Sequence, residues 1–166
     1  IKMITIEKIN NLNKSDFLGI FGNVFEKSDW IAEKVFDLKP FKNNEDFFLK
    51  IIGIYENSDK NIILRIFNSH PELVVEKKLT SNSKSEQSNA RLNECTNEEY
   101  NEFKKLNIDY KNKFNFPFII AVKGKHKTEI LNSFKQRIQN SLDEEFFEAK
   151  KQVKKIASFR LEEILK

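Results

Sequence analysis

The sequence predicts an all-α fold, a single-domain bundle of about eight or nine helices spanning residues 1–166. Three observations favour this class. Apolar residues recur at helical spacing through most of the chain, the three prolines interrupt that spacing where helix boundaries are expected, and only four glycines are available for tight hairpins. The 166 residues are enough for one buried core, which 16 phenylalanines should dominate.

Five helices are predicted in the first part of the chain from the spacing of apolar residues and from start signals. Pro40 and Pro71 mark boundaries of this region, because proline cannot continue a helical hydrogen-bond ladder. The expected segments are residues 6–12, 15–26, 29–38, 44–57 and 59–69.

Four further helices are predicted at residues 83–94, 97–114, 127–139 and 142–165. Thr96-x-x-Glu99 and Ser141-x-x-Glu144 have the pattern of capping boxes, in which a hydroxyl and a carboxylate bind each other's main chain at a helix start. The polar connection at residues 74–83 either closes over a pocket or is a passive surface loop.

The apolar run from Phe116 to Val122 is the exception to the helical pattern. It has the composition of a strand, but a single isolated strand cannot satisfy its own hydrogen bonds. We therefore expect this run to begin or pack as a helix.

The last predicted helix carries an apolar stripe that ends on a charge. An arginine, Arg160, follows at the next helical step, and it must find an anion, a helix C-terminus or a route to water. A substrate carbonyl or carboxylate would also suit its planar set of donors. The stripe consists of Leu142, Phe146, Ala149, Val153 and Ile156.

The charge pattern argues against nucleic acid as a partner. The net charge is +4, but 25 acidic residues are interleaved with 29 basic ones and no basic stripe emerges. The single cysteine, Cys95, cannot form an intramolecular disulfide and has no metal-ligand spacing around it. No secretory peptide or membrane span is visible, so we expect a cytoplasmic protein that binds no membrane; whether residues precede Ile1 is left open.

Two short segments stand out as candidates for chemistry. His70 precedes Pro71, which disfavours helical backbone angles at the histidine and so places its side chain at a helix end. This arrangement suits a positioned proton donor, although a histidine and a proline ending a helix are also common punctuation. In Ser83-x-x-Glu86, a capping box is a sufficient structural reason for both residues.

Six separated sequence blocks span nearly the whole chain. They are Phe25-Glu26-x-Ser28-x-Trp30-Ile31-Ala32-Glu33, Pro40-Phe41, His70-Pro71-Glu72-Leu73, Ser83-x-x-Glu86-Gln87, Leu106-Asn107-x-x-Tyr110-x-x-Lys113-Phe114-x-Phe116-Pro117-Phe118-Ile119-Ile120-Ala121-Val122 and Ile156-Ala157-x-x-Arg160-Leu161. No block is decisive alone, but in this order and spacing they together resemble the OHCU decarboxylases, the 2-oxo-4-hydroxy-4-carboxy-5-ureidoimidazoline decarboxylases of purine catabolism.

This resemblance implies a set of site residues. His70 would be the proton-transfer residue, and Glu86 the second catalytic group, holding the ureido and ring nitrogens together with Gln87. Main-chain groups would contribute from the apolar run, because apolar side chains offer a polar ligand no hydrogen bonds. The remaining substrate-binding residues implied are Pro71, Ser83, Ile119, Ile120, Ala121, Val122 and Arg160.

The chemistry implied needs no cofactor and no metal. The carboxyl group that leaves sits beside a ring C=N, so the substrate itself delocalises the electrons that are released. Imidazole titrates near neutral pH, and His70 would return a proton to one face of the product, giving (S)-allantoin. The family also implies a homodimer. The alternative is a catalytically inactive helical interaction module on the same scaffold.

Two departures from the family pattern concern the backbone. Relatives usually carry glycine where Arg91 stands after Ala90, so a bulky charge enters where close helix approach is expected and could alter the pocket. Asn115 also replaces a usual glycine, a milder change because asparagine tolerates left-handed backbone angles.

Overall fold

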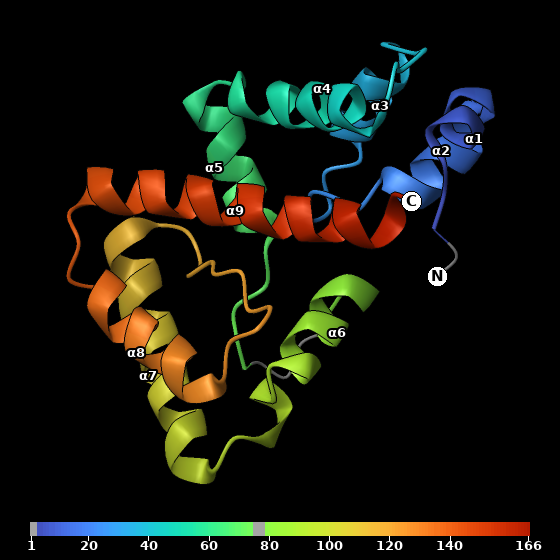
Figure 1. Cartoon of the computed structure of the whole chain (residues 1–166). Coiled ribbons are helices and arrows are strands. Elements are labelled where there is room, and N and C mark those ends of the chain that lie inside the picture. Colours follow the sequence, from blue (N-terminus) through green and yellow to red (C-terminus); the bar gives the residue numbers. More distant parts are fainter. Residues whose placement is uncertain (1–2, 75–78) are drawn as a thin grey trace. The chain divides into compact units, whose positions relative to one another are not determined.

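Helices make up most of the chain in the computed structural model, which describes residues 3–74 and 79–166 (Figure 1). Within these residues there are nine α-helices and one short 3₁₀ helix, which confirms the predicted all-α class. The only ladder-type pairing among them is an isolated bridge between Ile4 and Leu165. The same residues contain no helix long and apolar enough to cross a membrane.

The chain separates into two units. The first unit holds the described residues up to Ser69 together with Lys154–Lys166, and the second holds the described residues from His70 to Val153. The long helix α9, Leu142–Ile164, contributes a part to each. Whether residues 1–166 behave as one domain stays a prediction.

The first unit is built from five short helices and the end of α9. Their bounds are α1 Ile6–Asn11, α2 Lys14–Phe21, α3 Trp30–Phe36, α4 Asn44–Glu56 and α5 Lys60–Ser69. Asparagine side chains start two of them, since Asn13 accepts from the N–H of Asp16 and Asn43 from that of Asp46. The predicted helix at 15–26 ends early, at Phe21.

Phenylalanine rings fill the core of this unit, as the composition predicts. Phe17, Phe21 and Phe47 are buried, with ring centroids 4.8 Å apart for the first pair and 4.9 Å apart for Phe21 and Phe47. Phe41 adds a fourth ring 4.7 Å from Phe47. Edge and tilted contacts of this kind are the favoured geometry for aromatic pairs.

A buried ion pair crosses the first unit. Arg160 in α9 is 3% exposed, and its Nη2 donates to Oε2 of Glu26, a fully buried carboxylate, at 2.8 Å. Its Nη1 donates to the carbonyl of Asn23, also at 2.8 Å. The arginine at the end of the helix stripe has therefore found an anion within the protein.

The second unit contains α6 Ser81–Asn89, the 3₁₀ helix η1 Leu92–Glu94, α7 Asn97–Phe114, α8 Lys127–Arg137 and the first half of α9. Both predicted capping boxes are confirmed. Thr96 and Glu99 bind each other's main chain at the start of α7, and Ser141 and Glu144 do so at the start of α9.

Phenylalanines also dominate the core of the second unit. Phe118 stacks on Phe134 with centroids 3.9 Å apart, and the guanidinium of Arg137 lies 4.3 Å from the centroid of the Phe118 ring. The buried ring of Tyr110 meets Phe118 edge-on at 5.4 Å. This cluster joins α7 and α8 to the segment between them.

Three sequence predictions are wrong in this unit. The run 116–122 is not helical; it crosses the unit without a turn or bend after Phe116. The helix predicted at 83–94 divides into α6 and η1. Leu142, placed in the buried stripe of α9, is 61% exposed, whereas Glu145, one turn on, is fully buried.

Arg91 separates α6 from η1. Its φ is 59° and its side chain is exposed. Glycine adopts left-handed backbone more readily than other residues, so this conformation by itself favours the glycine of the family pattern. Asn115, the C-cap of α7, has a φ of 63°, as its tolerance of left-handed angles predicts.

We predict that Glu26→Ala destabilises the protein by about 3–5 kcal/mol, because it leaves the Arg160 guanidinium buried without its carboxylate. Free energies of unfolding from urea titration measure the effect. The matched control is Glu56→Ala, which removes the exposed ion pair with Lys154 and should cost less than about 1 kcal/mol. Equal losses for the two variants would contradict the prediction.

We predict that Arg91→Gly stabilises the protein by about 0.5–1 kcal/mol. Glycine removes the steric clash of Cβ in left-handed backbone, and the greater conformational entropy of glycine in the unfolded chain offsets part of this gain. Asn115→Gly tests the same conformation at a residue that already tolerates it, and should gain less. The same denaturant titration compares them. A destabilised Arg91→Gly variant would show that the arginine side chain has a role that its exposure hides.

Candidate active site

His70 lies directly after the last residue of α5, as the His-Pro pair predicts. Its side chain is 8% exposed and its Nε2 is a buried atom. Pro71 and Glu72, which follow, are half-buried. A histidine at such a position is shielded from bulk water, which favours proton exchange with a bound molecule over exchange with solvent.

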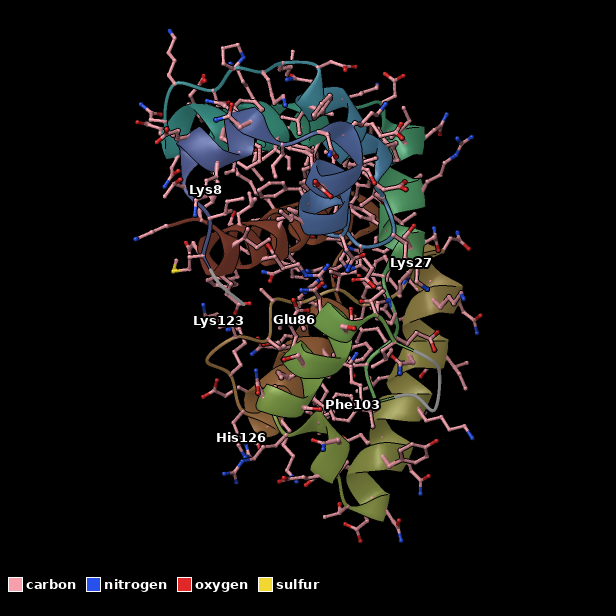
Figure 2. The ribbon with its side chains drawn as sticks, turned by 90° about the vertical axis from the view of Figure 1, so that its right-hand side faces the viewer. Lys8, Lys27, Glu86, Phe103, Lys123 and His126 are labelled. Carbon is pink, nitrogen blue, oxygen red and sulfur yellow. The ribbon has the colours of Figure 1, made fainter. Side chains whose placement is uncertain are left out.

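The helix α6 carries the second group of predicted site residues. Ser83 and Gln87 are 4% and 8% exposed, and Glu86 is half-buried. Figure 2 shows Glu86 on α6. Residues three and four apart share one side of a helix, so Ser83, Glu86 and Gln87 lie on adjoining parts of one face.

The capping-box interpretation of Ser83 and Glu86 is wrong. The N-cap of α6 is Thr80, whose hydroxyl accepts from the N–H of Ser83 at 3.3 Å. Ser83 therefore lies inside the first turn of the helix rather than at its cap. The helix start gives no structural reason for the carboxylate of Glu86.

Gln87 ties α6 to the segment that follows His70. Its Oε1 accepts from the main-chain N–H of Val74 at 3.2 Å, and its Nε2 donates to the carbonyl of Glu72 at 3.4 Å. Val74 has a φ of 54°, which is uncommon for a β-branched residue. The predicted loop at 74–83 begins here, and its residues 75–78 lie outside the described part of the chain.

Asn107 of α7 holds the same segment from the other direction. It is 4% exposed, and its Nδ2 donates to the carbonyl of Leu73 at 2.9 Å. Its Oδ1 is buried and has no hydrogen-bond partner among residues 3–74 and 79–166. The main chain at 72–74, two to four residues after the histidine, is thus held by two side-chain amides.

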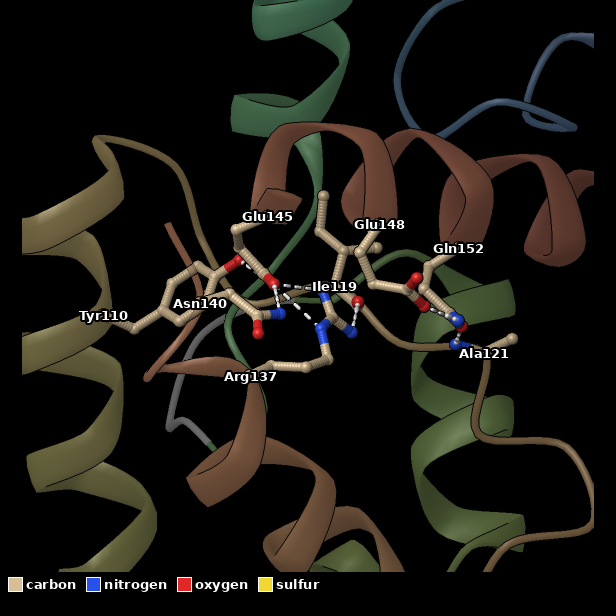
Figure 3. A network of polar contacts seen from close by, with 8 residues as sticks. All are labelled: Tyr110, Ile119, Ala121, Arg137, Asn140, Glu145, Glu148 and Gln152. Atoms are coloured by element: carbon tan, nitrogen blue, oxygen red, sulfur yellow. Dashed lines mark hydrogen bonds and ion pairs between the residues drawn. The ribbon is translucent and has the colours of Figure 1, made fainter. Parts of the chain in front are cut away.

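The segment 119–122 is buried throughout, with exposures of 2–6%. The carbonyl of Ile119 accepts from Nη1 of Arg137 at 2.6 Å, and the N–H of Ala121 donates to Oε1 of Gln152 at 3.0 Å (Figure 3). These two bonds, from α8 and α9, hold the segment in place of the helical hydrogen bonds that we expected.

Arg160, the remaining predicted site residue, belongs to the first unit and is paired there with Glu26. The second unit brings the His70 segment and α6 together through Gln87. Convergence of His70, Glu86 and Arg160 on one cavity stays a prediction.

Several residues around these segments were missed by sequence reasoning. Asn107 was part of the family pattern, but no role was assigned to it. Glu145 and Gln152 share the buried face of α9, and a helical wheel would have placed them beside Ala149 had polar residues been considered for that face. Nothing in the sequence around Arg137 indicates that it reaches Ile119.

The other histidine, His126, is exposed and caps α8, with Nδ1 accepting from the N–H of Thr128 at 3.3 Å (Figure 2). Within the described ranges no cluster of three or more His, Cys, Asp or Glu side chains is placed to hold a metal ion. That the reaction uses neither metal nor cofactor stays a prediction.

Comparison with known proteins places these motifs in a family. The chain is 40% identical over 164 residues to the uric acid degradation bifunctional protein of Bacillus sp. (strain TB-90), of which it covers 33%, so it spans about a third of that relative's length. It is 30% identical to the 2-oxo-4-hydroxy-4-carboxy-5-ureidoimidazoline decarboxylase of Haloferax volcanii, covering 96% of this chain and 95% of that protein.

Solved structures show the same fold. An (S)-allantoin synthase superposes with a TM-score of 0.81 over 98% of this chain and 54% of its own, at 24% identity. An OHCU decarboxylase crystallised in the presence of (S)-allantoin gives a TM-score of 0.71 over 86% of this chain and 94% of its own, also at 24% identity. The sequence pattern of one family matches residues 10–162, and the chain belongs to that family, the OHCU decarboxylases.

Proposed function

We propose that this chain catalyses the cofactor-independent decarboxylation of 2-oxo-4-hydroxy-4-carboxy-5-ureidoimidazoline, OHCU, to (S)-allantoin in urate degradation. The main support is the family match over residues 10–162, which includes the His70-Pro71 and Ser83-x-x-Glu86-Gln87 motifs. The Haloferax volcanii relative, matched over 95% of its length, is named as a decarboxylase of OHCU.

The substrate's own bonds supply the electron sink. The bond between the ring carbon and the carboxylate breaks, its electron pair forms a C=C bond to the carbon that bears the ureido group, and the C=N electrons move to nitrogen. Carbon dioxide leaves and the ring nitrogen takes one proton. The resulting enol then loses its hydroxyl proton and gains a proton on the ureido-bearing carbon, which gives allantoin. The protein has to orient the ring and move protons.

His70 is the group that we assign to the enol step. Imidazole accepts and donates protons near neutral pH, so one residue can take the hydroxyl proton and return a proton to carbon. Its side chain is buried and lies at the end of α5, which suits delivery from a fixed direction. Delivery to one ring face would make the product a single enantiomer.

The face of α6 is assigned to the polar end of the substrate. We place the carboxylate of Glu86 against the ureido N–H groups, away from the carboxylate that leaves. Ser83 and Gln87, buried on the same helix, supply a hydroxyl and an amide. Pro71 contributes a rigid apolar contact next to the histidine.

Main-chain groups at Ile119, Ile120, Ala121 and Val122 complete the proposed pocket. The carbonyl of Ile119 and the N–H of Ala121 already have partners, so the N–H groups of Ile120 and Val122 are the better placed to bind substrate oxygens. Arg160 is the proposed anchor for a substrate carbonyl or carboxylate. Its bonds to Glu26 and Asn23 hold the guanidinium in one orientation.

The assembly and location stay predictions from the family. We expect a homodimer, a cytoplasmic location, and neither nucleic acid nor membrane as a partner. Sedimentation of the purified protein checks the dimer. The competing function, an inactive helical interaction module, is separated from the enzyme by the activity assay that follows.

The decisive assay generates OHCU in place from urate with the enzymes that act before it. Addition of this protein should speed the loss of OHCU absorbance and should give (S)-allantoin, detected by circular dichroism. Racemic allantoin formed at the uncatalysed rate would overturn the proposed function.

We predict that His70→Asn lowers kcat/KM by about 10²–10⁴-fold, because an amide cannot transfer the proton. The same assay measures the loss. His126→Asn is the matched control: it changes the exposed histidine to a residue that also caps a helix well, and activity should be kept. Equal rates for His70→Asn and the unmodified protein would remove His70 from the mechanism.

We predict that Glu86→Gln lowers turnover while the free energy of unfolding changes by less than about 0.5 kcal/mol, since Glu86 does not cap its helix. Thr80→Ala removes the actual cap of α6 and should cost about 1 kcal/mol. Thermal melting and rate measurements on both variants test this. If Glu86→Gln lost stability and kept its rate, its role would be structural.

A further inference from the structure

The buried run 117–122 has a main chain that helical hydrogen bonds do not satisfy. It passes through the second unit without a turn or bend, and its residues from Phe118 to Val122 are at most 6% exposed. Buried main-chain N–H and C=O groups nearly always have partners, because an unpaired one costs about 1–3 kcal/mol. We therefore ask which main-chain N–H and C=O groups on each edge of this run have a hydrogen-bond partner within the protein.

One edge is held by two side chains. The carbonyl of Ile119 accepts from Arg137 at 2.6 Å and the N–H of Ala121 donates to Gln152 at 3.0 Å. In an extended chain, main-chain groups of alternate residues point to the same edge, so these two bonds fix a single edge. Figure 3 shows both contacts together.

The two holding side chains are themselves fixed. Arg137 donates through Nε and Nη2 to Oε1 of Glu145 at 2.8 and 2.5 Å, and Tyr110 donates to the same oxygen at 2.5 Å. Burial, and then this hydrogen bond, raise the pKa of Tyr110, so its hydroxyl stays a donor. Gln152 donates through Nε2 to Oε1 of Glu148 at 2.8 Å.

The other edge has no such partners. In the part of the chain that the structure describes, the N–H groups of Ile120 and Val122 make no hydrogen bond, although both residues are only 6% exposed. Their natural partners are acceptor oxygens of a bound ligand. The carbonyl and carboxylate oxygens of the proposed substrate have that chemistry.

We propose that Gln152 is a positioning residue of the decarboxylase site: together with Arg137 it holds one edge of the 119–121 main chain, so that the N–H groups of Ile120 and Val122 on the opposite edge meet the substrate. This inference rests on the proposed function. Gln152 touches no substrate in this scheme; it acts through Ala121. A small shift of the segment would misplace both N–H groups, and misplacements near 1 Å cost up to about 10²-fold in rate.

The arrangement allows a charge exchange as the test. In Gln152→Glu the new carboxylate can still accept from Ala121, but it has no N–H for Glu148, and two carboxylates then face each other. In the double variant Glu148→Gln with Gln152→Glu, the glutamine donates to the glutamate and the acceptor for Ala121 is restored. Gln152→Leu abolishes the contact, and no change at Glu148 can restore it.

The unmodified enzyme is assayed first, because its inactivity would refute the proposed function itself. With an active enzyme, Gln152→Glu should raise KM and lower kcat/KM by about tenfold or more, and the double variant should return within about threefold of the starting value. Gln136→Glu, the same change at an exposed glutamine of α8, is the matched control and should alter neither constant.

Two further readouts separate positioning from stability. The melting temperature of each variant should lie above the assay temperature, so that each variant is folded during the assay. The fraction of allantoin formed as the S enantiomer should fall in Gln152→Glu and recover in the double variant. The inference is overturned if Gln152→Glu keeps its kcat/KM, or if its loss follows only the folded fraction. It is also overturned if the double variant is no better than the single one.

Discussion

A carboxylate with no exposed surface, that of Glu145, binds three helices of the second unit, α7, α8 and α9, to one another. A buried charge is tolerated only when it is paired and hydrogen-bonded, and here a guanidinium, a phenol and an amide supply those bonds from Arg137, Tyr110 and Asn140. The end of α8 and the C-terminal part of α7 are thereby bound to the start of α9. The same guanidinium covers the ring of Phe118 and binds Ile119. This buried ion pair, together with the bond from Ala121 to Gln152, thus sets the path of a segment that lacks helical hydrogen bonds.

The polar helix α6 depends on interactions of a different kind. Its sequence, Ser81–Asn89, contains no apolar side chain, so no hydrophobic face attaches it to the core. Ser83 and Gln87 are nevertheless buried, and Gln87 binds main chain at Glu72 and Val74. A helix that is polar all round needs specific polar contacts to be stable. This buried polar face is the part of α6 to which the proposed function assigns the polar end of the substrate.

The helical class, the phenylalanine core, both capping boxes and the left-handed Asn115 could be predicted because each depends on neighbouring residues or on composition. The sequence did not distinguish Thr80 from Ser83 as the N-cap of α6, since both residue types cap helices well. The run 116–122 was assigned wrongly because its partners are side chains more than 15 residues away. The candidate site residues came from family motifs. The side chains that hold the neighbouring main chain, such as Asn107 and Gln152, could be identified only from the structure.

Arg91 stands where the family pattern has glycine, and its backbone conformation gives a second reason for that pattern. A glycine at that position suggested close packing, but the backbone turns left-handed there and the arginine side chain is exposed. The substitution therefore changes the local cost of the turn between α6 and η1. Ser83 and Gln87, which lie on α6 before this turn, are buried.

The side-chain amide of Gln87 has two lone pairs on oxygen and two hydrogens on nitrogen. One lone pair is used by Val74 and one hydrogen by Glu72, so each end of the group retains capacity for a second bond. A ligand bound by that remaining capacity would not have to displace the main chain at 72–74. Recognition and scaffolding would then share a single planar group, and the main chain beside His70 would not have to rearrange on ligand binding.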